Sequence, residues 1–224
     1  MILPADGGLK VHCVVCGEMM TNVYVLVAPP AGAGQDDAQA VCWVVDTGLT
    51  VRPLMDLLRR DGRRPERLLL THGHADHIAG VADVKAAWPE AVLTAPGGDA
   101  AMLTDPMANL SGWFGAHITA GPPDETVRPG DDLPMGPLLW RVLDLAGHTS
   151  GGVGYYCAAA GVVMVGDALF AAGIGRTDIP GASEDRLLTN IRQNLLTLPD
   201  ATRVLPGHGP PTTIGDERRS NPFL

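Results

Sequence analysis

The segment 72–77, with the sequence HGHADH, places three histidines and one aspartate directly after an apolar run. Neutral imidazole and carboxylate are common protein ligands of zinc and related metal ions. In a loop at a strand end, His72 and His74 can point the same way, whereas Asp76 and His77 begin a helix and can face a second direction. The spacing therefore favours two adjacent metal ions over one.

Three further residues of the same chemical types follow other β-like runs. His148 lies in "LAGHTSGG", Asp167 ends "VVMVGD", and His208 lies in "VLPGHGPP". Because each follows a predicted strand, all three can reach one edge of a sheet sandwich. A single histidine in such a place is more often hydrogen-bonded structure than a ligand, but the joint occurrence predicts a metal site. His12 and His117 lie outside these motifs and are not expected to bind metal.

The elements that must position these residues alternate in the first half of the chain. The apolar spacing of 51–60 and 76–88 predicts helices, and apolar or β-branched runs predict strands. The connection at 28–40 is polar and rich in Gly and Pro. Such alternation favours α/β layers. The predicted strands of this half are 11–16, 22–28, 41–48 (ending in a turn), 67–71 and 91–95.

The second half is richer in strands. A helix is predicted at 184–197, where Ser183 is a suitable N-cap ahead of Glu184 and Asp185. No repeat or long linker divides the chain, so a single domain is expected over 1–224. The predicted strands of this half are 138–145, 153–158, 161–165 and 202–205.

The segment 105–122 has no clean period and carries Trp113 and Phe114. Long irregular segments are often functional covers, and this one could cover the active site. An alternative is an irregular segment whose aromatic side chains pack on the core. Both interpretations stay open from the sequence alone.

Composition limits the kinds of partner. The formal net charge of −9 disfavours nucleic acid and anionic membranes as partners. Neither a signal peptide nor an apolar run of about 18 residues is evident, so a cytoplasmic location is expected. The four cysteines are too sparse for a disulfide framework. Cys13 and Cys16 form a C-x-x-C pattern, and their β-branched surroundings favour strand packing over redox chemistry. A homo-oligomer is compatible with the sequence.

The order His-x-His-x-Asp-His, Gly-His-Thr, Gly-Asp and Gly-His resembles the metallo-β-lactamase fold superfamily over nearly the whole chain. The stretches "GDALFAAGIGRTDIPG" and "PGHGPPTTIGDERRSNPFL" look like short bacterial glyoxalase II-like (hydroxyacylglutathione hydrolase-like) enzymes. The resemblance implies an α/β fold, a four-layer αββα sandwich with the metal site at one edge of the two sheets, and no C-terminal helical substrate domain. It also implies a ligand set: His72, His74 and His148 on the first metal, Asp76, His77 and His208 on the second, and Asp167 bridging them.

The resemblance further implies a metal-dependent hydrolase that opens a small-molecule thioester, such as S-lactoylglutathione, by a metal-bridging hydroxide. The two divalent ions are expected to be zinc, and iron or manganese suits the same ligand types. Asp76 and Asp167 are the expected catalytic carboxylates. Arg176 is a candidate for binding substrate, with a surface ion pair to Asp178 as its alternative. Tyr155 is a second candidate, with strand packing as its alternative.

Two other functions stay open. A persulfide dioxygenase resembles the chain in its His-x-His-Ala-Asp-His core, and would hold a single iron through His72, His148 and Asp167. A non-catalytic metal-binding module would keep the ligands without turnover. In addition, His208 is followed by Gly-Pro, where longer glyoxalase II enzymes carry a tyrosine. This departure weakens the expectation of tight glutathione recognition.

Overall fold

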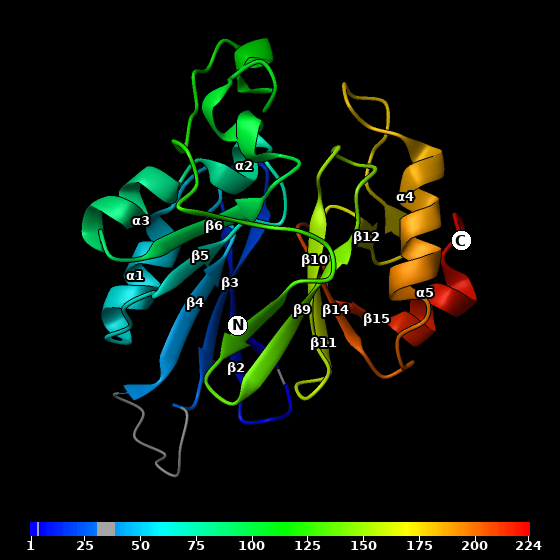
Figure 1. Ribbon diagram of the computed structural model, residues 1–224, viewed down its shortest axis with the longest axis horizontal. Coiled ribbons are helices and arrows are strands. Elements are labelled where there is room, and N and C mark those ends of the chain that lie inside the picture. Colours follow the sequence, from blue (N-terminus) through cyan, green and yellow to red (C-terminus); the bar gives the residue numbers. More distant parts are fainter. Residues whose placement is uncertain (4, 31–38) are drawn as a thin grey trace.

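Two β-sheets pack face to face, and helices cover the outer face of each sheet (Figure 1). The computed structural model describes residues 1–3, 5–30 and 39–224. Buried apolar side chains form three clusters, one between the sheets and one between each sheet and its helices. The architecture is thus the expected four-layer αββα sandwich.

The first sheet contains its strands in sequence order, antiparallel up to β4 and parallel from β4 onward. Parallel neighbours end at the same edge, so the loops after β4, β5 and β6 adjoin. The sequence did not predict β1 and β7, because strands of two or three residues are too short to show a hydrophobic period. Residues 31–38 of the predicted connection lie outside the described residues. The strands are β1 (Ile2–Leu3), β2 (Lys10–Cys16), β3 (Thr21–Ala28), β4 (Val41–Val45), β5 (Arg67–Leu69), β6 (Val92–Pro96) and β7 (Glu125–Val127).

The second sheet has the strand order β15-β14-β11-β10-β9-β8. Its strands are β8 (Asp132–Met135), β9 (Leu138–Asp144), β10 (Val153–Cys157), β11 (Val162–Gly166), β14 (Arg203–Pro206) and β15 (Thr212–Thr213). Strands β11 and β14 are parallel, so the residues that follow them lie at one edge. A separate small hairpin, β12 (Leu169–Phe170) with β13 (Gly173–Ile174), follows β11.

Helix α1 (Arg52–Arg60) covers the first sheet as predicted, but the single helix predicted at 76–88 is wrong in its middle. That segment forms α2 (Ala75–Ile78) and α3 (Val81–Ala87), separated at Gly80. A Cβ on Gly80 would lie 2.6 Å from Val51 Cγ2, so glycine permits a close contact there. The Gly80 N–H donates to the Gly48 carbonyl at 3.1 Å, which draws the chain out of one continuous helix.

Helix α4 (Glu184–Asn190) covers the second sheet and begins as predicted, because the Ser183 hydroxyl accepts a hydrogen bond from the Arg186 N–H. It continues as a π-helical turn, η4 (Ile191–Leu195). Helix α5 (Ile214–Ser220) follows and was not predicted. Among the described residues, no helix is long and apolar enough to cross a membrane.

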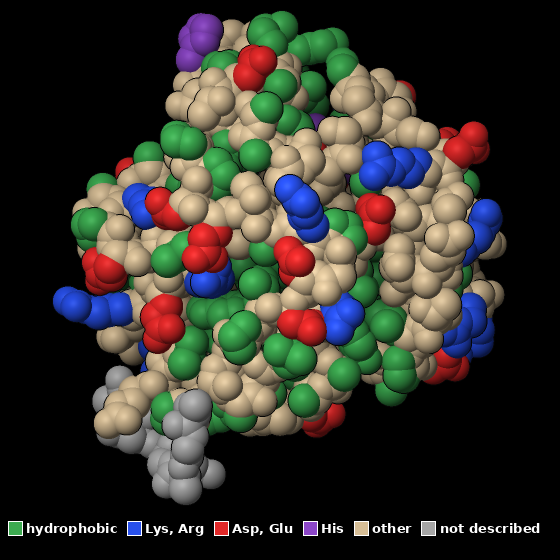
Figure 2. Space-filling view, in the orientation of Figure 1, with side chains coloured by type: hydrophobic (Ala, Val, Ile, Leu, Met, Phe, Trp, Pro, Cys, Tyr) green, Lys and Arg blue, Asp and Glu red, His purple; other side chains and the backbone are tan. Residues whose placement is uncertain are grey.

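The segment between β6 and β7 contains two short 3-10 turns, η2 (Ala100–Thr104) and η3 (Ser111–Phe114). Trp113 is 59% exposed and Phe114 is 87% exposed. Hydrophobic side chains gather over this part of the molecule, at the top of the view (Figure 2). The alternative in which these aromatic side chains pack on the core is therefore wrong.

The C-x-x-C pattern lies within β2, and its two thiols face opposite sides of the sheet. Cys13 is part of the core between the sheets, and Cys16 is part of the core under the helices. Both are buried free thiols. The strand-packing interpretation is therefore confirmed.

Candidate metal centre

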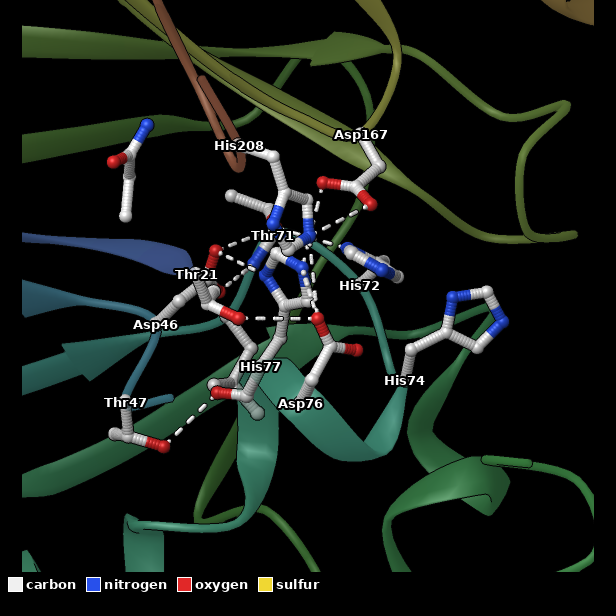
Figure 3. A network of polar contacts seen from close by, with 12 residues as sticks. Thr21, Asp46, Thr47, Thr71, His72, His74, Asp76, His77, Asp167 and His208 are labelled. Carbon is white, nitrogen blue, oxygen red and sulfur yellow. Dashed lines mark hydrogen bonds and ion pairs between the residues drawn. The ribbon is translucent and has the colours of Figure 1, made fainter. Parts of the chain in front are cut away.

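The seven residues predicted to bind metal meet where strand ends and loops of both sheets adjoin. Figure 3 labels six of them, all except His148. They come from the β5–α2 loop, from α2, from the β9–β10 loop and from the ends of β11 and β14: His72, His74, Asp76, His77, His148, Asp167 and His208. Residues separated by more than a hundred positions thus share one site.

The first cluster joins the two sheets. His72 and His74 lie after β5 of the first sheet, and His148 lies after β9 of the second. His74 Nδ1 is 2.9 Å from His148 Nε2. One ring nitrogen from each of the three residues lies within 4.8 Å of the others. All three imidazoles are buried, so this cluster could hold one ion.

The second cluster contains Asp76, His77 and His208, which also offer atoms within 4.8 Å of one another. Asp76 Oδ2 lies 3.2 Å from His208 Nε2 and 3.4 Å from His77 Nε2. The Thr21 hydroxyl, at the start of β3, donates to the same carboxylate oxygen at 3.1 Å. This cluster could hold a second ion.

Asp167 lies between the two clusters. Its Oδ1 is 3.4 Å from His77 Nε2, and its Oδ2 is 3.4 Å from His208 Nε2. The same Oδ2 is 3.7 Å from His148 Nε2, a residue of the first cluster. One carboxylate therefore faces groups of both clusters, as a bridging ligand must.

Hydrogen bonds behind the imidazoles set which ring nitrogen faces the site. His148 Nδ1 donates to the Arg176 carbonyl at 2.9 Å, and His72 Nδ1 lies 3.1 Å from the Thr71 hydroxyl oxygen. His77 Nδ1 lies 2.8 Å from Asp46 Oδ2. In His72 and His77 the buried Nε2 atom, which has no hydrogen-bond partner among the described residues, then faces the cluster. Hydrogen bonds behind the ring orient histidine ligands of metals in this way.

Asp46, just after β4, is a functional candidate that sequence reasoning missed. It is buried and accepts hydrogen bonds from Thr71 N and Thr71 Oγ1, each at 2.9 Å, as well as from His77. Its φ of 58° is in the left-handed region, which non-glycine residues rarely adopt. The available signal was its place at the end of a buried strand, the same place that marked Asp167.

Asn22 in β3 is a second residue that the sequence did not reveal. Its side-chain amide donates to the carbonyls of Pro206 at 3.0 Å and Gly209 at 2.8 Å. These carbonyls flank the segment that carries His208. The Tyr24 hydroxyl donates to the same Pro206 carbonyl at 2.7 Å. The first sheet thus holds in place a loop of the second.

Four of the five buried side-chain polar atoms that lack a hydrogen-bond partner, within the described residues, belong to this site: His72 Nε2, His74 Nε2, His77 Nε2 and Asp167 Oδ1. A buried polar atom without a partner costs about 1–3 kcal/mol. Imidazole and carboxylate are also the donor types that zinc, iron and manganese accept. The residues present therefore fit divalent metal ions.

Electrostatics point the same way. Burial first, and then the neighbouring His148, lower the pKa of His74 to about 3, which leaves a neutral imidazole. Burial also opposes a charge on His77. The carboxylates of Asp76, Asp167 and Asp46 outweigh that effect and hold the pKa of His77 well above its ordinary value. The carboxylates therefore favour a positive charge at the centre of the cluster.

The two residues predicted to bind substrate lie differently. The Arg176 guanidinium is exposed and pairs with Asp178, with Nε 2.7 Å from Oδ1, so the predicted alternative of a surface ion pair is present. Tyr155 is fully buried, and its hydroxyl donates to the Leu70 carbonyl at 2.7 Å. The prediction that Tyr155 contacts substrate is therefore wrong, since a fully buried side chain has no surface for a ligand.

Fold and site together define a class of protein. The family model described as the metallo-beta-lactamase superfamily matches residues 16–208. The chain therefore belongs to the metallo-β-lactamase superfamily, whose members bind divalent metals.

Several relatives can be aligned with most of this chain over most of their own length. The chain is 37% identical over 209 residues to the probable metallo-hydrolase YqgX of Bacillus subtilis, covering 93% of this chain and 94% of YqgX. It is 34% identical over 183 residues to the hydroxyacylglutathione hydrolase GloC of Haemophilus influenzae, covering 81% and 86%. Together with the histidine cluster, these relatives support a metal-dependent hydrolase.

Two solved structures are similar over nearly the whole chain. The BLEG-1 B3 metallo-beta-lactamase has a TM-score of 0.86 at 35% identity, covering 96% of this chain and 99% of that one. TTHA1623 in a di-iron-bound form has a TM-score of 0.80 at 33% identity, covering 96% and 100%.

Proposed function

We propose that this protein is a dinuclear metallohydrolase that cleaves small-molecule thioesters. The observation that carries the proposal is Asp167, whose two oxygens face histidines of both clusters. In the proposed ligand set, His72, His74 and His148 hold the first ion, Asp76, His77 and His208 hold the second, and Asp167 bridges them. The di-iron-bound relative supports two ions; zinc and manganese suit the same donors.

Two divalent ions in such a site lower the pKa of bound water to near neutrality and polarise a carbonyl oxygen. The chain itself supplies the orientation. Asp46 and Thr71 fix the rings of His77 and His72 from behind. Asp76 holds its Oδ2 3.2 Å from His208 Nε2 and 3.1 Å from the Thr21 hydroxyl. We assign that carboxylate to proton transfer during turnover.

A thioester suits the groups around the site better than an amide. A thiolate leaving group has a conjugate-acid pKa near 8.5 and needs little protonation, whereas an amide nitrogen requires a general acid. Outside the proposed ligand set, the carboxylates beside the clusters, Asp46 and Asp99, are already engaged, because each accepts three hydrogen bonds. The relative named hydroxyacylglutathione hydrolase supports the same assignment.

The direct test is a substrate panel on protein loaded with zinc, iron or manganese. We expect hydrolysis of S-lactoylglutathione or of thioesters with other thiols, and little turnover of a chromogenic β-lactam. The β-lactam arm is included because a close structural neighbour is named a β-lactamase. Oxygen consumption on glutathione persulfide, without thioester hydrolysis, would instead establish the dioxygenase.

The dinuclear assignment has its own test. Asp167→Ala removes the carboxylate between the clusters, and we expect hydrolysis to fall by about two orders of magnitude or more. The number of bound ions, measured by elemental analysis, should fall below two. A near-normal rate with two ions bound would contradict the bridging role.

A further inference from the structure

Asp99 is a buried carboxylate that joins the two loops of the first cluster without being one of the proposed ligands. It follows β6 and is fully buried. Its Oδ2 accepts hydrogen bonds from Gly73 N at 3.1 Å and from the Thr149 hydroxyl at 2.6 Å, and its Oδ1 accepts one from Gly151 N at 2.7 Å. Gly73 lies between two proposed ligands, and Thr149 directly follows a third.

The loops meet closely at this point. A Cβ placed on Gly151 would lie 2.4 Å from the Gly98 carbonyl carbon, so no side chain fits between the two backbones. Asp99 therefore links the first sheet to the second where their backbones touch. A change at Asp99 would shift His74 relative to His148, whose facing ring nitrogens are 2.9 Å apart.

Only a carboxylate satisfies this position fully. Three donors converge on Asp99, and an ionised carboxylate is an acceptor at both oxygens. An asparagine would place its own N–H groups against one of those donors. Burial raises the pKa of Asp99, although its three hydrogen bonds oppose the shift.

We propose that Asp99 is a positioning residue that sets the distance between the His72–His74 loop and His148, and thereby the affinity of the first metal position. This inference rests on the ligand set of the proposed function. Asp99 acts through backbone and hydroxyl groups next to the ligands, and the Thr149 hydroxyl is part of the same clamp.

The test compares Asp99→Asn with wild-type protein in stepwise binding of Zn²⁺ against a chromophoric chelator, and in the visible spectrum of Co²⁺-loaded protein. We expect the zinc affinity of the first metal position to fall about 10–100-fold, the typical effect of altering a group behind metal ligands. The other affinity should stay within about threefold. The cobalt bands should shift because the first coordination geometry changes.

A matched control is Asp105→Asn, the same chemical change at an exposed residue of the neighbouring segment, where both affinities should be unchanged. Thr149→Val removes only the 2.6 Å hydrogen bond from the Thr149 hydroxyl to Asp99 and should lower the zinc affinity of the first metal position by a smaller factor. If Asp99→Asn does not fold, this variant tests the role of Asp99 in its place. Loss of thermal stability with unchanged affinities and cobalt spectrum would overturn the role of Asp99. Wild-type protein that binds no divalent ion would overturn the proposed function itself.

Discussion

The Thr71 hydroxyl connects a proposed ligand to the carboxylate behind it, and its removal gives a sharp test of the site. Thr71 Oγ1 donates to Asp46 Oδ2 at 2.9 Å and lies 3.1 Å from His72 Nδ1, from which it accepts a hydrogen bond. Thr71→Val keeps the side-chain shape and removes both bonds. Thr71→Ser keeps the hydroxyl and removes only a methyl group.

The expected cost follows from the contacts. The valine variant loses the hydrogen bond to Asp46, worth about 1 kcal/mol. It also leaves the buried His72 Nδ1–H without an acceptor, which costs about 1–3 kcal/mol. Together these give about 2–4 kcal/mol of lost unfolding free energy. At about 2–4 °C per kcal/mol for a chain of this size, the melting temperature should fall by roughly 5–15 °C. Because the His72 ring is no longer held, zinc affinity should fall about 10–100-fold.

Thermal unfolding in the presence of a chelator measures the first effect, and competition with a chromophoric chelator measures the second. Thr71→Ser should lose about 1 kcal/mol through the missing methyl group and bind zinc within about threefold of wild type. Equal zinc affinities for the valine and serine variants would refute the argument, because the serine variant keeps the hydroxyl that the valine variant lacks.

Three further outcomes are expected. Asn22→Ala releases the backbone beside His208 and should weaken one zinc affinity about tenfold, seen as one altered step in the same titration; two unaltered steps would contradict this. Arg176→Ala should change unfolding free energy by less than about 1 kcal/mol, but lower kcat/KM for glutathione thioesters more than for other thioesters; equal effects would exclude anion binding. Burial, the largest cause, raises the pKa of Cys16 to about 11 and of Cys42 to about 12. Since a raised pKa keeps a thiol protonated at pH 8, Ellman's reagent should label both slowly in folded protein and rapidly in denaturant. Rapid labelling of both in the folded state would contradict the burial.

The residues gathered at the centre could be predicted because their positions follow a general rule. Each follows or adjoins a strand, and the ends of parallel strands share an edge. Asp167 after β11 and His208 after β14 illustrate this, since these strands pair in parallel. The α/β layering could be predicted because helical and strand periods alternate along the first half of the chain, whereas the αββα order of the layers followed only from the family resemblance.

The residues behind the proposed ligands could not be predicted because their roles lie in contacts between distant segments. Asp46 contacts a residue 25 positions away, and Asp99 contacts one 52 positions away. Asn22 contacts a carbonyl 187 positions away. A single polar residue near a strand or turn has many structural explanations, and spacing within one segment does not reveal its partner.

Tyr155 shows how closeness in sequence can mislead. It lies seven positions after His148, but successive side chains of β10 point to opposite faces of the sheet. Tyr155 faces the core between the sheets, whereas Tyr156 packs at the core under the helices. Register within the sandwich, rather than distance along the chain, decides which side chain reaches the site.

The centre is costly for the fold, and this cost explains the hydrogen bonds behind it. It concentrates Asp76 and Asp167 beside buried imidazoles, and four of its polar atoms have no hydrogen-bond partner in the described part of the chain. A divalent ion that binds only the folded state offsets such costs, by about 2.7 kcal/mol at a hundred times its Kd. That gain depends on ligands held close to their bound positions before the ion arrives. Asp46, Asp99 and Asn22 meet this requirement, since each ties a segment that carries proposed ligands to another part of the sandwich.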